Sequence, residues 1–375
     1  MKSKLIKGFA LVSLSAMMAF AVIGCGSSST GSSESTSADT TTEAATETAA
    51  EVETEAATEA ATEEATEEAT AVDPTTVKVA LILPGTINDQ GWNTEAYDGL
   101  MLVEALGCQT AYSESVAASD YESTFRGYAE QGFHVVIGHG TEFVDAAEKV
   151  AVDFPETMFL LTSSDATMEP NVGSLQNLNN EQGFIAGVVA ALASESHVVG
   201  SVGGMEIPSI QSYMLGFEQG VAYVDNGTTA LIAYTGDFDD ATKGKEQAKA
   251  FIDQGADVIS HDADGAGLGI FEAVKEAGEG YYAIGAVKDQ YEQLPAQTLT
   301  SATNSIGEGI LVAIEDYLQG ELEPICYKFG IAEGTIGLAD YHECADVLTE
   351  EEKQFVTDTM DKIVSGEIEV ESAQN

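Results

Sequence analysis

The most constraining feature of this chain is a regular alternation, from residue 77 to residue 318, of short apolar runs and longer stretches of helical period. The short runs are rich in valine and isoleucine and are apolar almost throughout, which is typical of strands that are covered on both faces. We expect strands at 77–83, 135–138, 158–162, 198–202, 230–234, 258–260 and 282–286. The pattern predicts an α/β fold of parallel sheets with helices on both sides.

Between these runs, apolar residues recur at i, i+3, i+4 and i+7, the period of an amphipathic helix. The expected helices are 94–106, 121–130, 142–154, 181–193, 209–224, 242–254, 268–277, 306–318 and a last one within about 349–366, at 350–364. A glycine helix end followed directly by a buried strand occurs at 132–136 and again at 255–259. This repeat predicts two similar, doubly wound lobes rather than one large sheet.

The folded part is therefore expected to be one ligand-binding domain, 74–375, made of two lobes. Lobe 1 is expected to comprise about 76–178 together with about 305–340, and lobe 2 about 179–304. Its length of about 300 residues is sufficient for two lobes of roughly 130–150 residues.

The first 25 residues have the three parts of a bacterial export signal. Three lysines precede an apolar run at 11–23, and the segment ends in Val22-Ile23-Gly24-Cys25. The run is shorter than the ~20 residues of a membrane-spanning helix. The segment resembles a lipoprotein signal, which implies a mature chain that starts at Cys25 and is lipidated there. An ordinary secretory signal is the alternative.

Residues 26–73 consist mainly of serine, threonine, alanine, glycine and thirteen acidic residues, without lysine or arginine. Such a segment cannot bury a core, so we expect a disordered acidic tether. As a random coil it would reach ~40 Å. Together with the lipid at Cys25, it predicts a domain held on the extracytoplasmic face of the cell membrane.

The formal net charge of −49 falls mostly on the folded part. An acidic surface of this kind repels phosphate backbones, so nucleic acid is not an expected partner. 

Sequence motifs of catalysis and metal binding are missing. There is no GxSxG elbow, Walker loop or HExxH motif, and the glycine-rich stretch 265–269 lacks GxGxxG spacing. Cys108, Cys326 and Cys344 have no CxxC spacing; Cys326 and Cys344 could form a disulfide or remain free. We expect a protein that is not an enzyme and has no cofactor or metal.

The loop at 84–93 is the first candidate for a binding site. It follows the first expected strand, and ligands of open parallel sheets bind beyond the carboxyl ends of strands. It contains Trp92, the only tryptophan, which could stack on a planar ligand or act as a hydrophobic staple under the next helix. Asp89 and Asn93 could contact the ligand or serve as turn former and helix cap.

Several sequence blocks, in a fixed order, resemble the basic membrane protein family of ABC-transporter substrate-binding lipoproteins. They are 88–93 (NDQGWN), 181–187, 202–208 with 216–221, 255–259, 265–269 and Asp289-Gln290. The resemblance spans about 77–318, and the number and order of the blocks make it specific. It implies a periplasmic binding protein type I-like fold with a hinge and an interlobe cleft. It also implies delivery of purine nucleosides or bases to a transporter permease and ATPase.

By this resemblance, Trp92 takes the place of an aromatic residue that stacks on the purine. Tyr213 takes the place of a second ring from the opposite lobe, and Gly204 lies in a family block. Each stacked pair contributes ~0.5–1.5 kcal/mol beyond burial. The expected polar contacts to the base edge are Asn93, Asp89 and Ser163 or Asp165.

The chain departs from the family at three positions. Leu83, Val287 and Asn304 stand where relatives that hold a ribose have two acidic residues and a lysine. This favours a free base, such as adenine or hypoxanthine, over a nucleoside. Alternatively, other polar residues replace the lost ones: His261, Asp262, Asp264 or Lys288.

The segment His261-Asp262-Ala263-Asp264 follows a buried strand and precedes a helix. Asp262 or Asp264 is expected to bond the ligand there; capping of the helix by Asp264 is the alternative. A metal site would need third and fourth ligands of fixed spacing, which the sequence lacks.

We therefore expect a monomeric, lipid-anchored binding protein whose lobes close on a purine and are recognised by an ABC importer. Two alternatives stay open at this point: a surface sensor or adhesin lipoprotein, and a binding protein for another small polar ligand such as a sugar.

Overall fold

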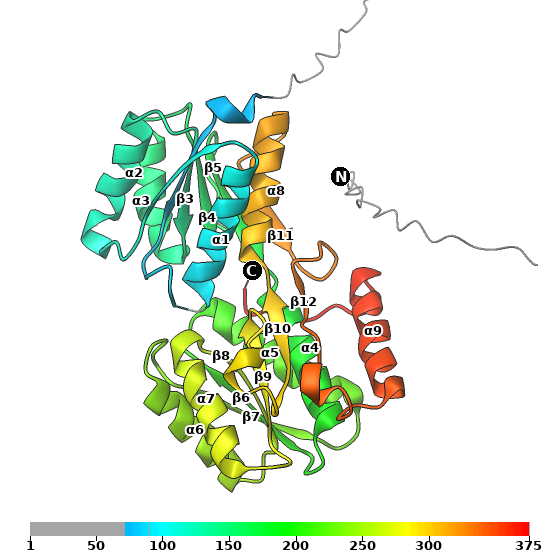
Figure 1. Ribbon diagram of the computed structural model, residues 1–375. Helices are drawn as coiled ribbons and strands as arrows, with labels where there is room; N and C mark the ends of the chain where they lie inside the picture. Colours follow the sequence, from blue (N-terminus) through cyan, green and yellow to red (C-terminus); the bar gives the residue numbers. More distant parts are fainter. Residues whose placement is uncertain (1–71, 90, 375) are drawn as a thin grey trace, which may run out of the picture. The chain divides into compact units, whose positions relative to one another are not determined.

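The continuous apolar runs form the central strands of two six-stranded sheets (Figure 1). The computed structural model describes residues 72–89 and 91–374; Cys25 and the expected tether up to residue 71 lie outside the described residues. The sheet of lobe 1 is parallel throughout, in the order β11-β5-β4-β3-β1-β2. Its strands are β1 (Lys78–Ile82), β2 (Gln109–Ser113), β3 (Val135–His139), β4 (Met158–Thr162), β5 (Val172–Asn177) and β11 (Cys326–Phe329).

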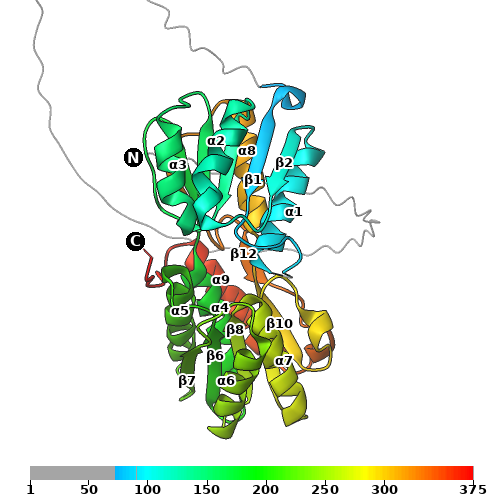
Figure 2. The same cartoon turned by 90° about the vertical axis from the view of Figure 1, so that its left-hand side faces the viewer.

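Helices cover both faces of this sheet, as the continuous hydrophobicity of its strands predicts. Val79 and Leu81 of β1 pack in a cluster with α1 (Trp92–Ala105) and α8 (Ile306–Gln319). Successive strand residues face opposite sides. The intervening Ala80 and Ile82 therefore pack against α2 (Tyr121–Glu130) and α3 (Val144–Ala151), which lie side by side in Figure 2.

The sheet of lobe 2 repeats this arrangement in the order β12-β10-β9-β8-β6-β7, with β12 antiparallel to β10. Its strands are β6 (Val198–Gly203), β7 (Thr229–Tyr234), β8 (Val258–Asp262), β9 (Tyr282–Val287), β10 (Thr298–Asn304) and β12 (Ile336–Leu338). One face carries α4 (Asn179–Ala193) and α5 (Pro208–Val224), the other α6 (Ala241–Asp253) and α7 (Asp264–Ala277).

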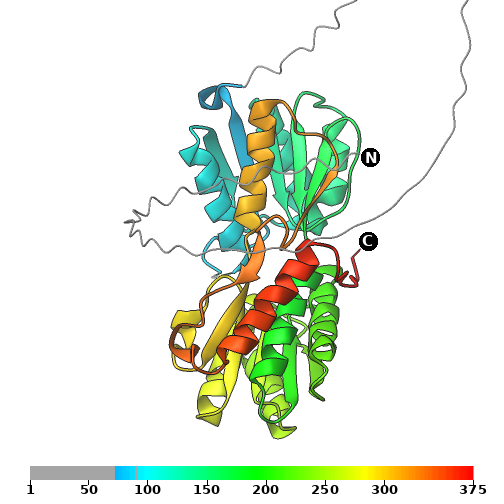
Figure 3. The same cartoon turned by 90° about the vertical axis from the view of Figure 1, so that its right-hand side faces the viewer.

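Glycines of two family blocks bring α4 and α5 into backbone contact. A methyl group at Gly183 would collide with the carbonyl oxygen of Tyr213, and one at Gly216 with that of Asn180. These blocks therefore serve helix packing in this chain. The last helix, α9 (Glu350–Val364), begins with a capping box of Thr349 and Glu352 and packs along α4 (Figure 3).

The chain passes between the lobes three times: from β5 to α4, from β10 to α8 and from β11 to β12. Buried amide side chains join the first two of these crossings. Asn177 Nδ2 donates to Asn304 Oδ1 (2.6 Å), Asn304 Nδ2 donates to Gln182 Oε1 (3.2 Å), and Gln182 Nε2 donates to the carbonyl of Ala302 (2.8 Å). Asn304 is thus part of the connection between the lobes.

The predicted α/β class with two parallel-strand lobes is confirmed. The expected helix 121–130 matches α2 fully. The expected helix 142–154 is shorter at both ends: a 3-10 turn at Thr141–Phe143 precedes α3, which ends at Ala151. In the described part of the chain, no helix is long and apolar enough to span a bilayer. The three described cysteines, including Cys326 and Cys344, are free thiols.

Candidate ligand-binding site

Trp92 opens α1 at the carboxyl edge of the lobe 1 sheet, and its half-buried indole is held by neighbours from two strands. The ring stacks on His139, at the end of β3, with centroids 3.6 Å apart and planes inclined by 27°. Its Nε1–H donates to Ser163 Oγ (3.2 Å), in the turn after β4. The indole is therefore fixed in position before any ligand arrives.

His139 is a neutral support for the indole. It is fully buried, its Nδ1 lies 2.7 Å from Thr162 Oγ1, and its Nε2 lies 3.1 Å from the carbonyl oxygen of Trp92. Because a carbonyl only accepts, the hydrogen must be on Nε2, and Nδ1 accepts from Thr162. Burial lowers the pKa of His139 to about 3. The sequence analysis missed this residue, although it directly follows the apolar run 135–138.

Asp89 and Asn93 organise the loop that precedes α1. Asp89 Oδ1 accepts from the N–H groups of Gly91 and Thr94 (both 3.0 Å), and Oδ2 accepts from Asn93 N and Nδ2 (both 2.8 Å). Burial opposes ionisation of Asp89, but these bonds outweigh it and keep its pKa below the ordinary value. Asp89 thus forms the turn and bonds the free N–H groups of the first turn of α1, while Asn93, inside that turn, holds the loop through Asp89.

Two aspartates of lobe 2 lie at the carboxyl end of β8, next to this loop. Asp264 Oδ1 is 3.4 Å from the backbone nitrogen of Trp92, and a methyl group at Gly91 would lie 2.6 Å from the same oxygen. Asp262 is 6% exposed, and its Oδ2 has no hydrogen-bond partner. Burial and the charge of Asp264 raise the pKa of Asp262 to about 8. Burial and the charge of Asp89 raise that of Asp264 to about 7.

Gly204 joins Asp262 to an aromatic residue that the sequence analysis missed. The N–H of Gly204 donates to the carbonyl of Asp262 (2.9 Å), and a methyl group at Gly204 would collide with the ring of Phe238. The half-buried Phe238 follows β7, as Trp92 follows β1. Its position after an apolar run is the signal that would have found it.

A family model described as ABC transporter substrate-binding protein PnrA-like matches residues 76–374. The chain belongs to this family, the Bmp family. Its members are solute-binding proteins rather than enzymes, which agrees with the site: stacked rings and hydrogen-bonding groups at the edges of two sheets.

Relatives agree with this assignment. Basic membrane protein A1 of Borrelia garinii subsp. bavariensis is 29% identical over 69% of this chain and 79% of its own length. The ABC transporter nucleoside-binding protein BmpA of Lactococcus lactis subsp. cremoris is 32% identical over 54% of this chain and 59% of its own length. An ABC transporter solute-binding protein from Aeropyrum pernix superposes with a TM-score of 0.70 at 24% identity, covering 80% of this chain and 94% of its own. The fold is that of type I-like periplasmic binding proteins.

The remaining predicted residues of this Bmp-family chain lie apart from the Trp92 loop or serve other contacts. Tyr213 is 0% exposed, and its hydroxyl is 2.7 Å from Ser260 Oγ in the core of lobe 2, so its ring is closed to a ligand here. Lys288 pairs across the lobes with Glu95 (3.3 Å) and Asp98 (3.0 Å) of α1. Asp165 is exposed in the turn after β4.

His261 lies on the face of the lobe 2 sheet that packs against α7, opposite to the face that carries Tyr213. Its Nε2 lies 2.9 Å from Gln290 Oε1, and its ring packs edge-on against Phe271. Burial lowers the pKa of His261 to about 4. In the described residues, no three side chains of His, Cys, Asp or Glu gather as a metal site.

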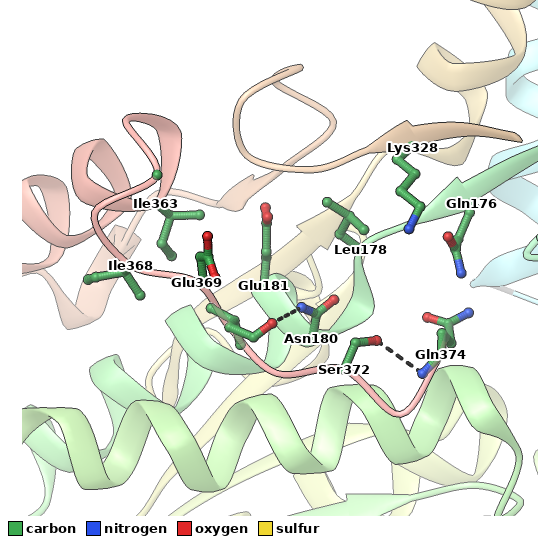
Figure 4. A pocket seen from close by; sticks show the side chains of 12 residues that line it. Gln176, Leu178, Asn180, Glu181, Lys328, Ile363, Ile368, Glu369, Ser372 and Gln374 are labelled. Carbon is green, nitrogen blue, oxygen red and sulfur yellow. Dashed lines mark hydrogen bonds between the residues drawn. The ribbon is translucent and has the colours of Figure 1, made fainter. Parts of the chain in front are cut away.

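A separate cavity of about 340 Å³ lies beside the hinge, under the C-terminal segment (Figure 4). Gln176 and Lys328 line it from lobe 1, Asn180 from the start of α4, and Ser372 and Gln374 from the C-terminal segment. It contains none of the predicted ligand-binding residues. The C-terminal segment is fastened there by the bond from Asn180 Nδ2 to the carbonyl of Val370 (2.8 Å).

Proposed function

We propose that this chain is the extracytoplasmic, lipid-anchored substrate-binding protein of an ABC importer, and that it captures a purine base or nucleoside by aromatic stacking. The observation that carries the proposal is the indole of Trp92, fixed between His139 and Ser163 beside the acidic groups of lobe 2. A ring that is already ordered loses little conformational entropy on binding, so its stacking energy contributes to affinity. The name of the Lactococcus relative, a nucleoside-binding protein, supports the same ligand class.

Phe238 is proposed as the second ring, in place of Tyr213. Phe238 is half-buried at the carboxyl end of β7, where ligands of such sheets bind. Tyr213 would have to leave the core and break its bond to Ser260 to reach a ligand.

A free base is favoured over a nucleoside. Leu83 is apolar and buried, and Val287 ends β9 as an apolar residue with φ +68°, a strained conformation for a β-branched side chain. Neither side chain can bond a ribose hydroxyl, and Asn304 is engaged in the hinge.

Ligand contacts from both lobes would favour the conformation with the lobes together, which the permease then recognises. The chain acts as a monomer in this proposal. Lipidation of Cys25 would hold it at the membrane; Cys25→Ser is expected to release it into the medium, and membrane retention of this variant in fractionated cells would contradict the anchor.

The experiment that tests the ligand is a thermal-shift screen of bases, nucleosides, sugars and amino acids, followed by calorimetry. A purine is expected to stabilise the protein, and Trp92→Ala to weaken its binding at least tenfold with the fold intact. Phe355→Ala, at an exposed ring on α9, is the matched control. Stabilisation by a sugar or amino acid but by no purine, or unchanged affinity in Trp92→Ala, would reject the proposal.

A further inference from the structure

The carboxyl group of Asp262 is a buried acceptor without a donor. It is 6% exposed, yet Oδ2 has no hydrogen-bond partner among the described residues. A buried polar atom that is left unpaired destabilises the folded state, so such an atom in a binding site indicates a missing partner. The position of Asp262 supports a missing ligand donor. Asp262 ends β8, and its carbonyl accepts from the N–H of Gly204, which itself contacts the ring of Phe238.

The titratable groups around Asp262 include no cation that could form an ion pair with its carboxylate. Asp264, at the start of α7, and the phenol of Tyr213, from α5, face it electrostatically. Asp264 in turn faces Asp89 and Asp239. All of these are acidic groups, so none of them offers a positive charge, and burial among them favours the protonated, neutral carboxyl. A ligand that brings N–H donors would supply the missing partners and displace that proton.

We propose, on the basis of the purine-binding function above, that Asp262 is the specificity residue of the site and accepts two adjacent N–H donors from the ligand, so that guanine-type bases are preferred. A carboxylate presents two oxygens side by side, which match two parallel N–H donors. On purines this pair is the N1–H and 2-amino group of guanine; hypoxanthine lacks the amino group, and adenine has an acceptor at N1.

Binding of such a ligand is coupled to release of a proton. Burial and the charge of Asp264 raise the pKa of Asp262 to about 8, so the carboxyl is mostly protonated at pH 7. The affinity for a paired-donor ligand therefore rises with pH up to about 8 and then levels off. A ligand that bonds the neutral acid, such as adenine, would show the opposite dependence.

Calorimetry with guanosine, inosine and adenosine, and with guanine and hypoxanthine, tests the proposal on the full chain. At pH 8 the wild type is expected to bind the guanine compound about tenfold more tightly than its hypoxanthine counterpart. In Asp262→Asn this preference falls below about threefold, while hypoxanthine compounds still bind. Asp340→Asn, at an exposed carboxylate, is the control and keeps the wild-type preference.

The outcomes separate this inference from the proposed function. If no purine binds the wild type, the proposed function fails. If purines bind but adenosine is preferred, if guanosine affinity falls between pH 6.5 and 8, or if Asp262→Asn keeps the guanine preference, the role of Asp262 is rejected while purine binding stands. Melting curves of Asp262→Asn confirm that the variant is folded before its affinities are compared.

Discussion

The two sides of the site differ in how well their polar groups are satisfied. On lobe 1, the indole of Trp92, the ring of His139 and the carboxylate of Asp89 have their hydrogen-bonding groups paired within the protein. On lobe 2, Asp262 keeps an unpaired buried oxygen. Unpaired buried groups of this kind are found at functional sites. Under the proposed function, lobe 1 would supply a rigid stacking surface, and lobe 2 a polar edge that the ligand completes.

The largest expected effect comes from removing the support of the rigid surface. His139→Ala deletes the ring beneath Trp92 and leaves a cavity and an unpaired Thr162 hydroxyl. We expect the free energy of unfolding to fall by about 2–4 kcal/mol and the purine affinity to fall with it. Denaturant melts and calorimetry would show both. A variant as stable and as tight-binding as the wild type would mean that lobe 1 is not preorganised by His139.

A substitution on lobe 2, Asp262→Asn, is expected to raise the free energy of unfolding, whereas His139→Ala lowers it. With a pKa of about 8 in the folded chain, Asp262 is protonated there and ionised in the unfolded chain between about pH 4 and 8. Unfolding then releases a proton, so the free energy of unfolding of the empty protein falls as pH rises through this range. Asp262→Asn removes this dependence and is expected to stabilise the empty protein by about 1–3 kcal/mol at pH 8.

Thermal melts of wild type and Asp262→Asn between pH 5 and 8.5 measure this difference. Asp340→Asn provides a baseline for the loss of one exposed charge. Parallel pH profiles of stability for wild type and Asp262→Asn would show that the unpaired carboxyl of Asp262 does not destabilise the empty protein. The proposed difference between the two lobes would then be rejected.

The smallest effect distinguishes the two aromatic candidates of lobe 2. Tyr213→Phe loses the hydrogen bond to Ser260 and is expected to cost about 0.5–1.5 kcal/mol of stability with purine affinity unchanged. Phe238→Ala is expected to weaken binding about threefold to tenfold with a smaller loss of stability. Calorimetry on Phe238→Ala decides whether Phe238 is the second ring, because a purine affinity equal to that of the wild type would reject it. Tyr213→Phe keeps its ring and therefore reports only on the hydroxyl.

Local sequence was sufficient to predict the strands that are apolar on both faces, but not the strands β5 and β10, which lead into the connections between the lobes. The sequences of β5 and β10 include Asn177, Thr300 and Asn304, which are buried because their amides and hydroxyl bond partners distant in the chain. Such strands have no apolar run to reveal them. The edge strand β2 is partly exposed, so it lacks the continuous apolar signal of a buried strand.

The site shows the same division. The location of Trp92 at the carboxyl edge of the sheet could be predicted because it follows a strand, whereas its contact with His139 arises where β3 and α1 meet in space. Tyr213 was expected to stack on the ligand because of the family resemblance. Whether a residue of α5 faces the core or the ligand depends on how the helix is rotated against the sheet, and the resemblance carries no information on that rotation. The pairing of Asp89 with Asn93 followed from residue types that favour caps.

The joint between the lobes consists of neutral amides at the row Asn177, Asn304 and Gln182. Neutral groups neither titrate nor attract counterions in the physiological range. Changes of acidity or ionic strength outside the cell would therefore act on the charged groups between the lobes, such as Lys288 with Glu95 and Asp98, and would leave the bonds of this amide row unaltered.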